Sequence, residues 1–211
     1  MFICKNPTDD RVLLGPEVEE HSQYYSRGEL YCPICYKRLV YNGTAEHPFD
    51  YFSHEDGTPD CTESESASIG HRLPVEIAIK RINNRIREVT AEPVDIDVER
   101  RIGGKHNFKI ADIRVTKPLK IAAEIYNEAS ELDLTRRLRT MFNSGYRAYV
   151  IFNLDGRRDV AEVERYIQQL APLKLGRFDP ETMDLSLGDL FSRRRISFDK
   201  SARNSLPWYI R

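Results

Sequence analysis

The chain has 211 residues, enough for one sizeable hydrophobic core or for a small module beside a main domain. Its 32 basic and 33 acidic residues balance, so the net charge indicates no particular partner. No apolar run approaches the roughly 20 residues of a membrane span, and the first residues lack the apolar core of a signal peptide. We therefore expect a soluble, cytoplasmic protein with no membrane partner. In that compartment its four cysteines suit metal binding better than disulfides.

The N-terminal region, residues 1–62, is predicted to consist of short strands and turns. The segments "FIC" and "RVLL" are strand-like and end at a Gly-Pro break at 15–16. Further on, "KRLVYNGT" predicts a hairpin with Asn42 and Gly43 at its turn. Cys4 lies in the first apolar strand, where we expect it to be a small core residue.

The other three cysteines cluster with a histidine in a pattern that is typical of a zinc module. "YCPIC" supplies Cys32 and Cys35, and "YFSHEDGTPDC" supplies His54 and Cys61. A Cys-x-x-Cys turn places two thiolates on one side of a metal, and the two later ligands can complete a tetrahedron. His47 is the alternative to His54, and a redox pair is the alternative to a metal site. With four protein ligands the zinc would be structural.

Residues 63–172 predict an α/β core that begins after the polar joint 63–68. The segment 71–89 has a helical period and Pro74 suits its first turn. Its apolar face comprises Val75, Ala78, Ile79, Ile82 and Ile86. "VDIDVER", a "GGKHN" loop and the two apolar runs of "KIADIRVTKPLKIAAEIY" then predict three strands, with a turn at Lys117 and Pro118.

The remainder of this core predicts a helix, a strand and a helix. The segment 130–145 is a helix whose inward residues are Leu134, Leu138, Met141 and Phe142, with Gly145 after its end. "YRAYVIFNL" is a buried strand. "DVAEVERYIQQL" is a helix with Val160, Val163, Ile167 and Leu170 on one face. The first three strands can form a meander, and the strand–helix–strand unit makes the fourth strand parallel to the third, with helices on both faces.

Two acids interrupt the apolar strands of this sheet. Asp112 and Glu124 lie on adjacent strands, where a carboxylate is costly unless something compensates it. If the carboxylates converge, they repel unless a cation lies between them, and Mg²⁺ or Mn²⁺ is the cation that prefers such oxygen ligands. The alternative is a pair of half-exposed acids at strand ends that are neutralised by Arg114 or Lys109.

Two further side chains could complete such a site. Tyr126 follows Glu124 by two positions and so shares its face, where it could touch an attacking water or a leaving oxygen. Glu76, on the first predicted helix, could supply a third carboxylate at the edge of the site.

The C-terminal extension, residues 173–211, ends in a basic tail. It includes the run Arg193, Arg194 and Arg195, and Trp208 and Tyr209 follow near the end of the chain. Basic residues interleaved with aromatic ones are suited to lie along a phosphate backbone. The alternative is a solvated tail without a partner.

These features together resemble the competence protein CoiA family, which pairs an N-terminal Cys-x-x-Cys zinc-ribbon-like module with a PD-(D/E)XK nuclease domain. The matching motifs are "CPIC" at 32–35, "FSH" at 52–54, "ESASIGH" at 65–71 with Lys80 beyond it, "KIAD" at 109–112 and "EIY" at 124–126. A helix with Arg136, Arg137 and Arg139, followed by Gly145, also fits, so that the resemblance covers about residues 30–153.

The chain departs from the family pattern at three places. Tyr126 stands where the family has glutamine, Lys109 replaces the arginine before Ala-Asp, and His71 and Lys80 are further apart than usual. The resemblance implies that Asp112 and Glu124 bind a catalytic metal, with Glu76 and Lys80 as additional site residues. Because Lys80 follows Glu76 by four residues on one helix face, it could compensate for the tyrosine.

The resemblance implies a mixed α/β fold, a restriction-endonuclease-like core behind a small zinc-binding β module, and a metal-dependent DNA nuclease that acts in recombination, repair or DNA uptake. DNA is the expected partner, together with a second copy of the chain and with recombination or repair proteins. The arginines of the second helix and of the tail would follow the DNA backbone. The alternatives are an inactive DNA-binding protein on the same fold and a protein-interaction adaptor built on the zinc module.

Overall fold

The protein is described from a computed structural model, which places residues 1–8, 10–18, 30–42, 51–61, 69–105, 108–126, 131–154, 161, 164–165, 168 and 174–193. The chain divides into two compact units, one of residues 1–98 with 115–119 and the other of residues 99–114 with 120–211. The module boundaries expected after residues 62 and 172 do not coincide with this division, and they stay predictions.

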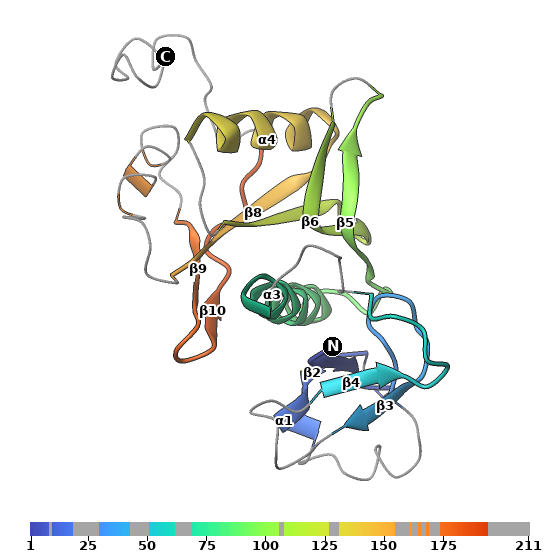
Figure 1. Ribbon diagram of the computed structural model, residues 1–211. Coiled ribbons are helices and arrows are strands. Elements are labelled where there is room, and N and C mark those ends of the chain that lie inside the picture. The colour runs from blue at the N-terminus through green and yellow to red at the C-terminus, as the bar shows by residue number, and fades with distance from the viewer. Residues whose placement is uncertain are drawn as a thin grey trace, which may run out of the picture. The chain divides into compact units, whose positions relative to one another are not determined.

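The described residues form short strands, three helices with defined bounds and one larger sheet (Figure 1). The helices are α1 (Gly15–Val18), α3 (Ile69–Arg87) and α4 (Glu131–Asn143). The N-terminal strands are β1 (Ile3–Lys5), β2 (Val12–Leu14), β3 (Leu39–Asn42) and β4 (Tyr51–His54). The later strands are β5 (Asp95–Gly103), β6 (Phe108–Lys117), β7 (Ile121–Tyr126), β8 (Arg147–Asn153), β9 (Gly176–Asp179) and β10 (Asp184–Ser186).

The N-terminal strands pair as two antiparallel ribbons, β1 with β2 and β3 with β4. The strands at "FIC" and "RVLL" are confirmed, and Cys4 faces Leu13 across the first ribbon. The predicted two-residue turn at Asn42 and Gly43 is wrong, because Asn42 pairs with Tyr51. The second strand of this hairpin is therefore β4, which carries His54. Gly43 itself lies outside the described residues.

Helix α3 buries the apolar face that its period predicts, since Val75, Ala78, Ile79, Ile82 and Ile86 are all at most 4% exposed. The helix begins earlier than expected, at Ile69, so Pro74 lies inside it rather than in its first turn. Proline has no N–H, and one backbone hydrogen bond is therefore missing at this position. The helix is tied to β2 by the Asn84 side chain, which accepts from the Val12 N–H at 3.0 Å and donates to the Val12 carbonyl at 3.1 Å.

Among the described residues, six strands form one sheet in the order β10-β9-β8-β7-β6-β5. Strands β5, β6 and β7 are adjacent and follow one another through short connections, so they form the predicted antiparallel meander. β7 and β8 are parallel, as the strand–helix–strand unit predicts. The sheet is therefore mixed, and the α/β class is confirmed. Strands β9 and β10 were not predicted. β9 runs parallel to β8, and β10 returns beside it as a hairpin.

Helix α4 lies across one face of this sheet and contacts β8 (Figure 1). Its predicted inward residues are all buried, namely Leu134, Leu138, Met141 and Phe142. They form one hydrophobic cluster with residues of β7 and β8, including Ala122, Tyr126 and Phe152. Gly145 follows the helix with φ of +80°, the left-handed conformation expected of a glycine at a helix C-terminus.

The apolar residues of the predicted third helix, Val160, Val163, Ile167 and Leu170, lie outside the described residues. Of that segment, Ala161, Glu164, Arg165 and Gln168 are described, and they are helical. Within the described part of the chain, no helix is both long and apolar enough to cross a membrane.

Two glycines with positive φ differ in the space around them, and this difference predicts different costs of substitution. A Cβ on Gly188 would lie 2.5 Å from the Gly176 nitrogen, whereas a Cβ on Gly145 would meet nothing within 4 Å. We expect Gly188→Ala to lower the free energy of unfolding by about 3 kcal/mol or more, since strain and a backbone clash add together. Gly145→Ala should cost about 1–2 kcal/mol through strain alone. Urea titration of both variants measures the difference, and equal costs would contradict the described packing beside β9.

Candidate metal centre and acidic pair

Four side chains of the first unit converge as the Cys-x-x-Cys spacing predicts. The ligand atoms of Cys32, Cys35, His54 and Cys61 all lie within 4.8 Å of one another. The Cys35 Sγ is 3.3 Å and the Cys61 Sγ 3.9 Å from the Nε2 of His54. Within the described part of the chain, no other group of three or more metal-ligating side chains lies together at one point.

The Cys-x-x-Cys turn is built by its own backbone. The Tyr36 N–H donates to the Cys32 carbonyl at 3.0 Å, and the Cys32 N–H donates to the Lys37 carbonyl at 2.8 Å. Inside this turn the N–H groups of Ile34 and Cys35 point at the Cys32 Sγ, at 3.4 and 3.5 Å. Donors directed at sulfur favour the thiolate form, which is the form that binds metals.

His54 is oriented for ligation by the chain that follows it. Its Nδ1 lies 3.1 Å from the Thr58 carbonyl oxygen and 3.0 Å from that of Pro59. A carbonyl can only accept, so the Nδ1 carries the proton and the lone pair of Nε2 faces the sulfurs. The alternative ligand, His47, lies outside the described residues.

The donor set fits a tetrahedral ion. With Zn–S near 2.3 Å and Zn–N near 2.0 Å, tetrahedral ligands are separated by roughly 3.5–3.8 Å, which is close to the observed spacing. The hydrogen bond with Cys61, together with burial, raises the pKa of the Cys32 thiol above its usual range. The Cys32 and Cys61 sulfurs thus share a proton. A metal ion that takes the place of this proton would release it on binding. The cluster could bind a metal ion such as zinc, and a redox pair would not require His54 and Cys61 to join it.

Cys4 takes no part in this cluster. It is fully buried in β1, and burial raises the pKa of its thiol to about 12. A thiol of this kind is unreactive at neutral pH. The expectation that Cys4 is a core residue is confirmed.

The acidic pair lies in the second unit, on neighbouring strands. Glu124 on β7 is 2% exposed, and Asp112 on β6 is half-buried. The Asp112 Oδ2 accepts a hydrogen bond from the Ile125 N–H at 2.6 Å. The Asp112 carboxylate therefore lies against the peptide bond that directly follows Glu124.

An arginine of α4 neutralises the more deeply buried acid. The Arg137 Nη1 lies 2.6 Å from the Glu124 Oε2, and the same nitrogen is 3.4 Å from the Ile110 carbonyl oxygen. The sequence alternative to a metal ion names Arg114 or Lys109 as the partner of the acids, and it does not name Arg137. Arg114 donates to the Arg101 carbonyl oxygen at 3.1 Å. The sequence did carry a signal for Arg137, since it follows Leu134 by three residues and precedes Met141 by four, within the apolar stripe of α4.

Tyr126 shares the face of Glu124, as expected, but it is a core residue. It is 5% exposed, belongs to the hydrophobic cluster beneath α4, and stacks on Phe152 with ring centroids 5.6 Å apart. These contacts account for an aromatic residue at this position by packing alone. A role of Tyr126 in steering a water stays a prediction.

Glu76 and Lys80 lie on α3, and both contact residues of the first unit. Glu76 is fully buried, accepts a hydrogen bond from the Phe2 N–H, and lies 3.8 Å from the Arg72 Nη2. Lys80 forms an ion pair with Glu17 of α1. These contacts fix the N-terminal segments on α3, and the catalytic roles expected of both residues stay predictions.

The predicted DNA-binding arginines differ in their surroundings. Arg136 and Arg193 are exposed and Arg139 is half-buried, whereas Arg137 is held by Glu124. Arg194 and Arg195 lie outside the described residues, as do Trp208 and Tyr209.

Comparison with known proteins adds no family assignment, because neither the family models nor the curated proteins give a match to this chain.

Proposed function

We propose that the protein is a metal-dependent DNA nuclease of the PD-(D/E)XK type, in which Asp112 and Glu124 hold the catalytic ion. The observation that carries the proposal is the Glu124 carboxylate, 2% exposed within a central strand, with the Asp112 carboxylate bound to the next peptide of the same strand. The arrangement of an acid on β6, an acid on β7 and then helix α4 supports it, because the resemblance implies that order.

A buried carboxylate is a poor way to stabilise a sheet. Replacing a buried ion pair by apolar residues of similar volume is often neutral or stabilising, so the pair of Glu124 and Arg137 is weak as a purely structural device. A functional role accounts better for an acid at this position. Asp112 and Glu124 would provide the oxygen ligands that Mg²⁺ or Mn²⁺ prefers. Such an ion, when bound, activates a water and stabilises charge on a phosphate.

Without a bound ion, the Arg137 guanidinium offsets the negative charge of Glu124 at this site. It is 30% exposed, so its guanidinium can retain Glu124 or turn toward solvent and a phosphate. One side chain on α4 would then either neutralise Glu124 or bind a phosphate of the DNA.

The cysteine cluster would serve the same protein as a structural zinc site. Four protein ligands leave no position for a substrate, so the zinc would stabilise residues 30–42 and 51–61 and carry no chemistry. The resulting module would be a platform for DNA or for a recombination or repair partner.

The test is a cleavage assay with labelled single-stranded, duplex and branched DNA, in the presence and absence of Mg²⁺ or Mn²⁺. We expect cleavage only with the divalent ion, and a loss of at least about a hundred-fold in rate in Asp112→Asn and in Glu124→Gln. Glu181→Gln is the matched control, because Glu181 is an exposed acid in the turn between β9 and β10. Cleavage that persists in both site variants would refute the proposal.

A DNA-binding protein without catalysis is the second candidate. The packing of Tyr126 on Phe152 favours it, because a buried ring offers neither the amide of the family's glutamine nor the amine of the lysine found in the wider superfamily. This candidate predicts DNA binding that needs no divalent ion and survives Asp112→Asn. Such binding, with no cleavage of any substrate, would replace the nuclease proposal.

A further inference from the structure

The Arg137 guanidinium fills a position between two neighbouring strands, where a cation meets a carboxylate and a backbone oxygen. Its Nη1 lies 2.6 Å from the Glu124 Oε2 of β7 and 3.4 Å from the Ile110 carbonyl oxygen of β6. Ile110 precedes Asp112 by two residues on the same strand, so this position adjoins the acidic pair. Carboxylate and carbonyl oxygens are also the groups that bind divalent ions. The chain therefore places one of its own cations at the site proposed for the metal.

A divalent ion and this guanidinium compete for the Glu124 Oε2. Mg²⁺ lies about 2.0–2.1 Å from its oxygen ligands, and the Arg137 Nη1 is only 2.6 Å from this oxygen. Two cations that close to one atom repel each other strongly, and the 2% exposure of the Glu124 side chain leaves little water to screen them. Binding of the ion to this oxygen therefore requires Arg137 to leave Glu124.

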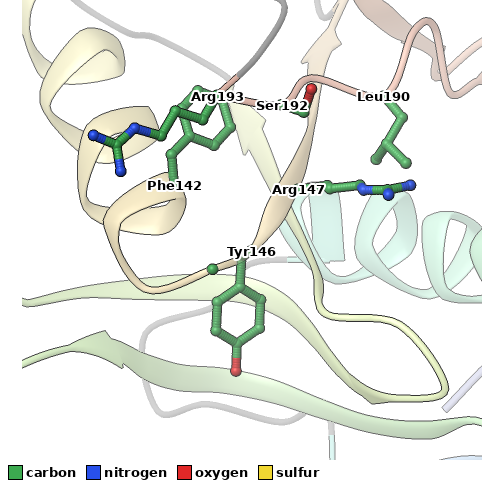
Figure 2. Close-up of a pocket in the computed structure, with 7 residues that line it drawn as sticks. Phe142, Tyr146, Arg147, Leu190, Ser192 and Arg193 are labelled. Atoms are coloured by element: carbon green, nitrogen blue, oxygen red, sulfur yellow. The ribbon is translucent and has the colours of Figure 1, made fainter.

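The exchange needs only a rotation of the Arg137 side chain, because helix α4 itself is fixed. Phe142 in the last turn of the helix is buried in the hydrophobic cluster on the sheet. The turn that follows is closed by the Tyr146 N–H, which donates to the Met141 carbonyl oxygen at 3.0 Å. Figure 2 shows Phe142 at the end of the helix and the turn that leads through Tyr146 into β8. The Arg137 side chain is 30% exposed and so has a path to solvent.

A phosphate is the ligand that can draw Arg137 away from Glu124, because arginine binds carboxylate and phosphate oxygens with the same planar fork of N–H donors. We propose that Arg137 couples the two ligands of this site. A DNA phosphate that binds Arg137 releases Glu124 for the divalent ion, so the ion binds tightly only together with the substrate. The inference deepens the proposed function by naming how the site is regulated, and it rests on that function for the identity of both ligands.

The size of the coupling follows from how often the ion pair is closed. If Arg137 holds Glu124 in about 90–99% of the molecules, the apparent affinity for the ion falls roughly ten- to hundred-fold below its intrinsic value. The coupling is reciprocal, so the ion must raise the affinity for the phosphate by the same factor. The protein without DNA would thus bind the ion, but weakly.

Mn²⁺ binding without DNA, followed by electron paramagnetic resonance, tests the competition. We expect Arg137→Gln to bind Mn²⁺ roughly ten- to hundred-fold more tightly than the unaltered protein. Arg137→Lys keeps a cation at this position and should lose most of this gain. Arg147→Gln is the matched control and should leave the affinity unchanged. Arg147 is an exposed arginine of the same unit, and it lines a cavity of about 590 Å³ whose lining residues include neither Arg137 nor the two acids (Figure 2).

A second measurement uses the unaltered protein, because Arg137→Gln is expected to be less stable. Mg²⁺ is titrated while the side-chain N–H signals of isotope-labelled arginine are recorded by nuclear magnetic resonance, and the Arg137 signal is identified by its absence in Arg137→Lys. We expect the slow rotation of an ion-paired guanidinium without Mg²⁺ and faster rotation once Mg²⁺ binds. Rotation of Arg137 that is equally slow at saturating Mg²⁺ would overturn the inference.

The coupling to the substrate is measured with a cleavage-resistant phosphorothioate oligonucleotide, single-stranded and duplex, by fluorescence anisotropy. The factor by which Mn²⁺ raises the affinity for DNA should be at least about ten-fold larger in the unaltered protein and in Arg147→Gln than in Arg137→Gln. An equal factor in all three proteins would contradict the coupling.

Failure of this inference and failure of the proposed function give different results. Equal Mn²⁺ affinity in the unaltered protein and in Arg137→Gln, at a site that Asp112→Asn abolishes, would overturn the inference and leave the proposed metal ligands intact. Mn²⁺ binding that neither Asp112→Asn nor Glu124→Gln weakens would refute the proposed function and the inference with it.

Discussion

Cys35→Ser is expected to lose the bound metal and, with it, the folded structure of residues 30–42 and 51–61. The Cys35 Sγ lies 3.3 Å from the His54 Nε2, and β3 and β4 form only a short ribbon that buries few side chains. Apparent binding energies of structural zinc are about 10–16 kcal/mol, which is comparable to the total stability of a domain. A hydroxyl does not replace the thiolate as a ligand, so the segment would have no source of stability of similar size.

Metal content and near-ultraviolet circular dichroism of the purified protein measure this effect. The unaltered protein should contain one zinc per chain and Cys35→Ser much less. Cys4→Ala is the matched control, because Cys4 is a buried cysteine outside the cluster, and it should retain the metal. Full zinc content in Cys35→Ser, or the same thermal unfolding of metal-loaded and metal-stripped protein, would show that the cluster is not a structural metal site.

Arg137→Gln is expected to destabilise the protein by about 3–5 kcal/mol, because it removes the guanidinium that lies against the buried charge of Glu124. The distance of 2.6 Å and the 2% exposure of Glu124 place this pair among the buried ones, where removal of one partner has its largest effect. The double variant Arg137→Gln/Glu124→Gln should recover most of the loss, since no buried charge remains.

The same variant distinguishes a metal site from a structural ion pair. If Asp112 and Glu124 bind a divalent ion, Mn²⁺ should stabilise Arg137→Gln, by about 2.7 kcal/mol at a hundred-fold excess over the dissociation constant. Thermal unfolding with and without Mn²⁺ measures the effect. No response to Mn²⁺ in Arg137→Gln, or an equal response in the double variant, would assign Glu124 to the structural pair with Arg137.

Regular periodicity made much of the fold predictable. The apolar faces of α3 and α4 repeat at helical spacing, and the runs around Asp112 and Glu124 are long and apolar, so element type and order followed from the sequence. The zinc-type cluster was predictable for another reason, since a turn of fixed geometry brings Cys32 and Cys35 together and few residues separate His54 from Cys61.

Features that depend on tertiary contact were not predictable in this way. The strands β9 and β10 are short and carry polar residues. β9 is a strand because β8 offers it an edge, and β10 then pairs with β9. The pairing of Asn42 with Tyr51 is set by the register of β3 and β4 rather than by a local turn. The partner of Glu124 comes from a helix thirteen residues later in the chain, so only the packing of α4 on the sheet reveals it.

The most direct test of the central claim is the binding of Mn²⁺ to the zinc-loaded protein, followed by electron paramagnetic resonance. We predict one bound Mn²⁺ per chain in the unaltered protein and in Glu181→Gln, and at least a ten-fold weaker site in both Asp112→Asn and Glu124→Gln. The same Mn²⁺ affinity in all four proteins would contradict the account, because the two strand acids would then not be the ligands of the ion.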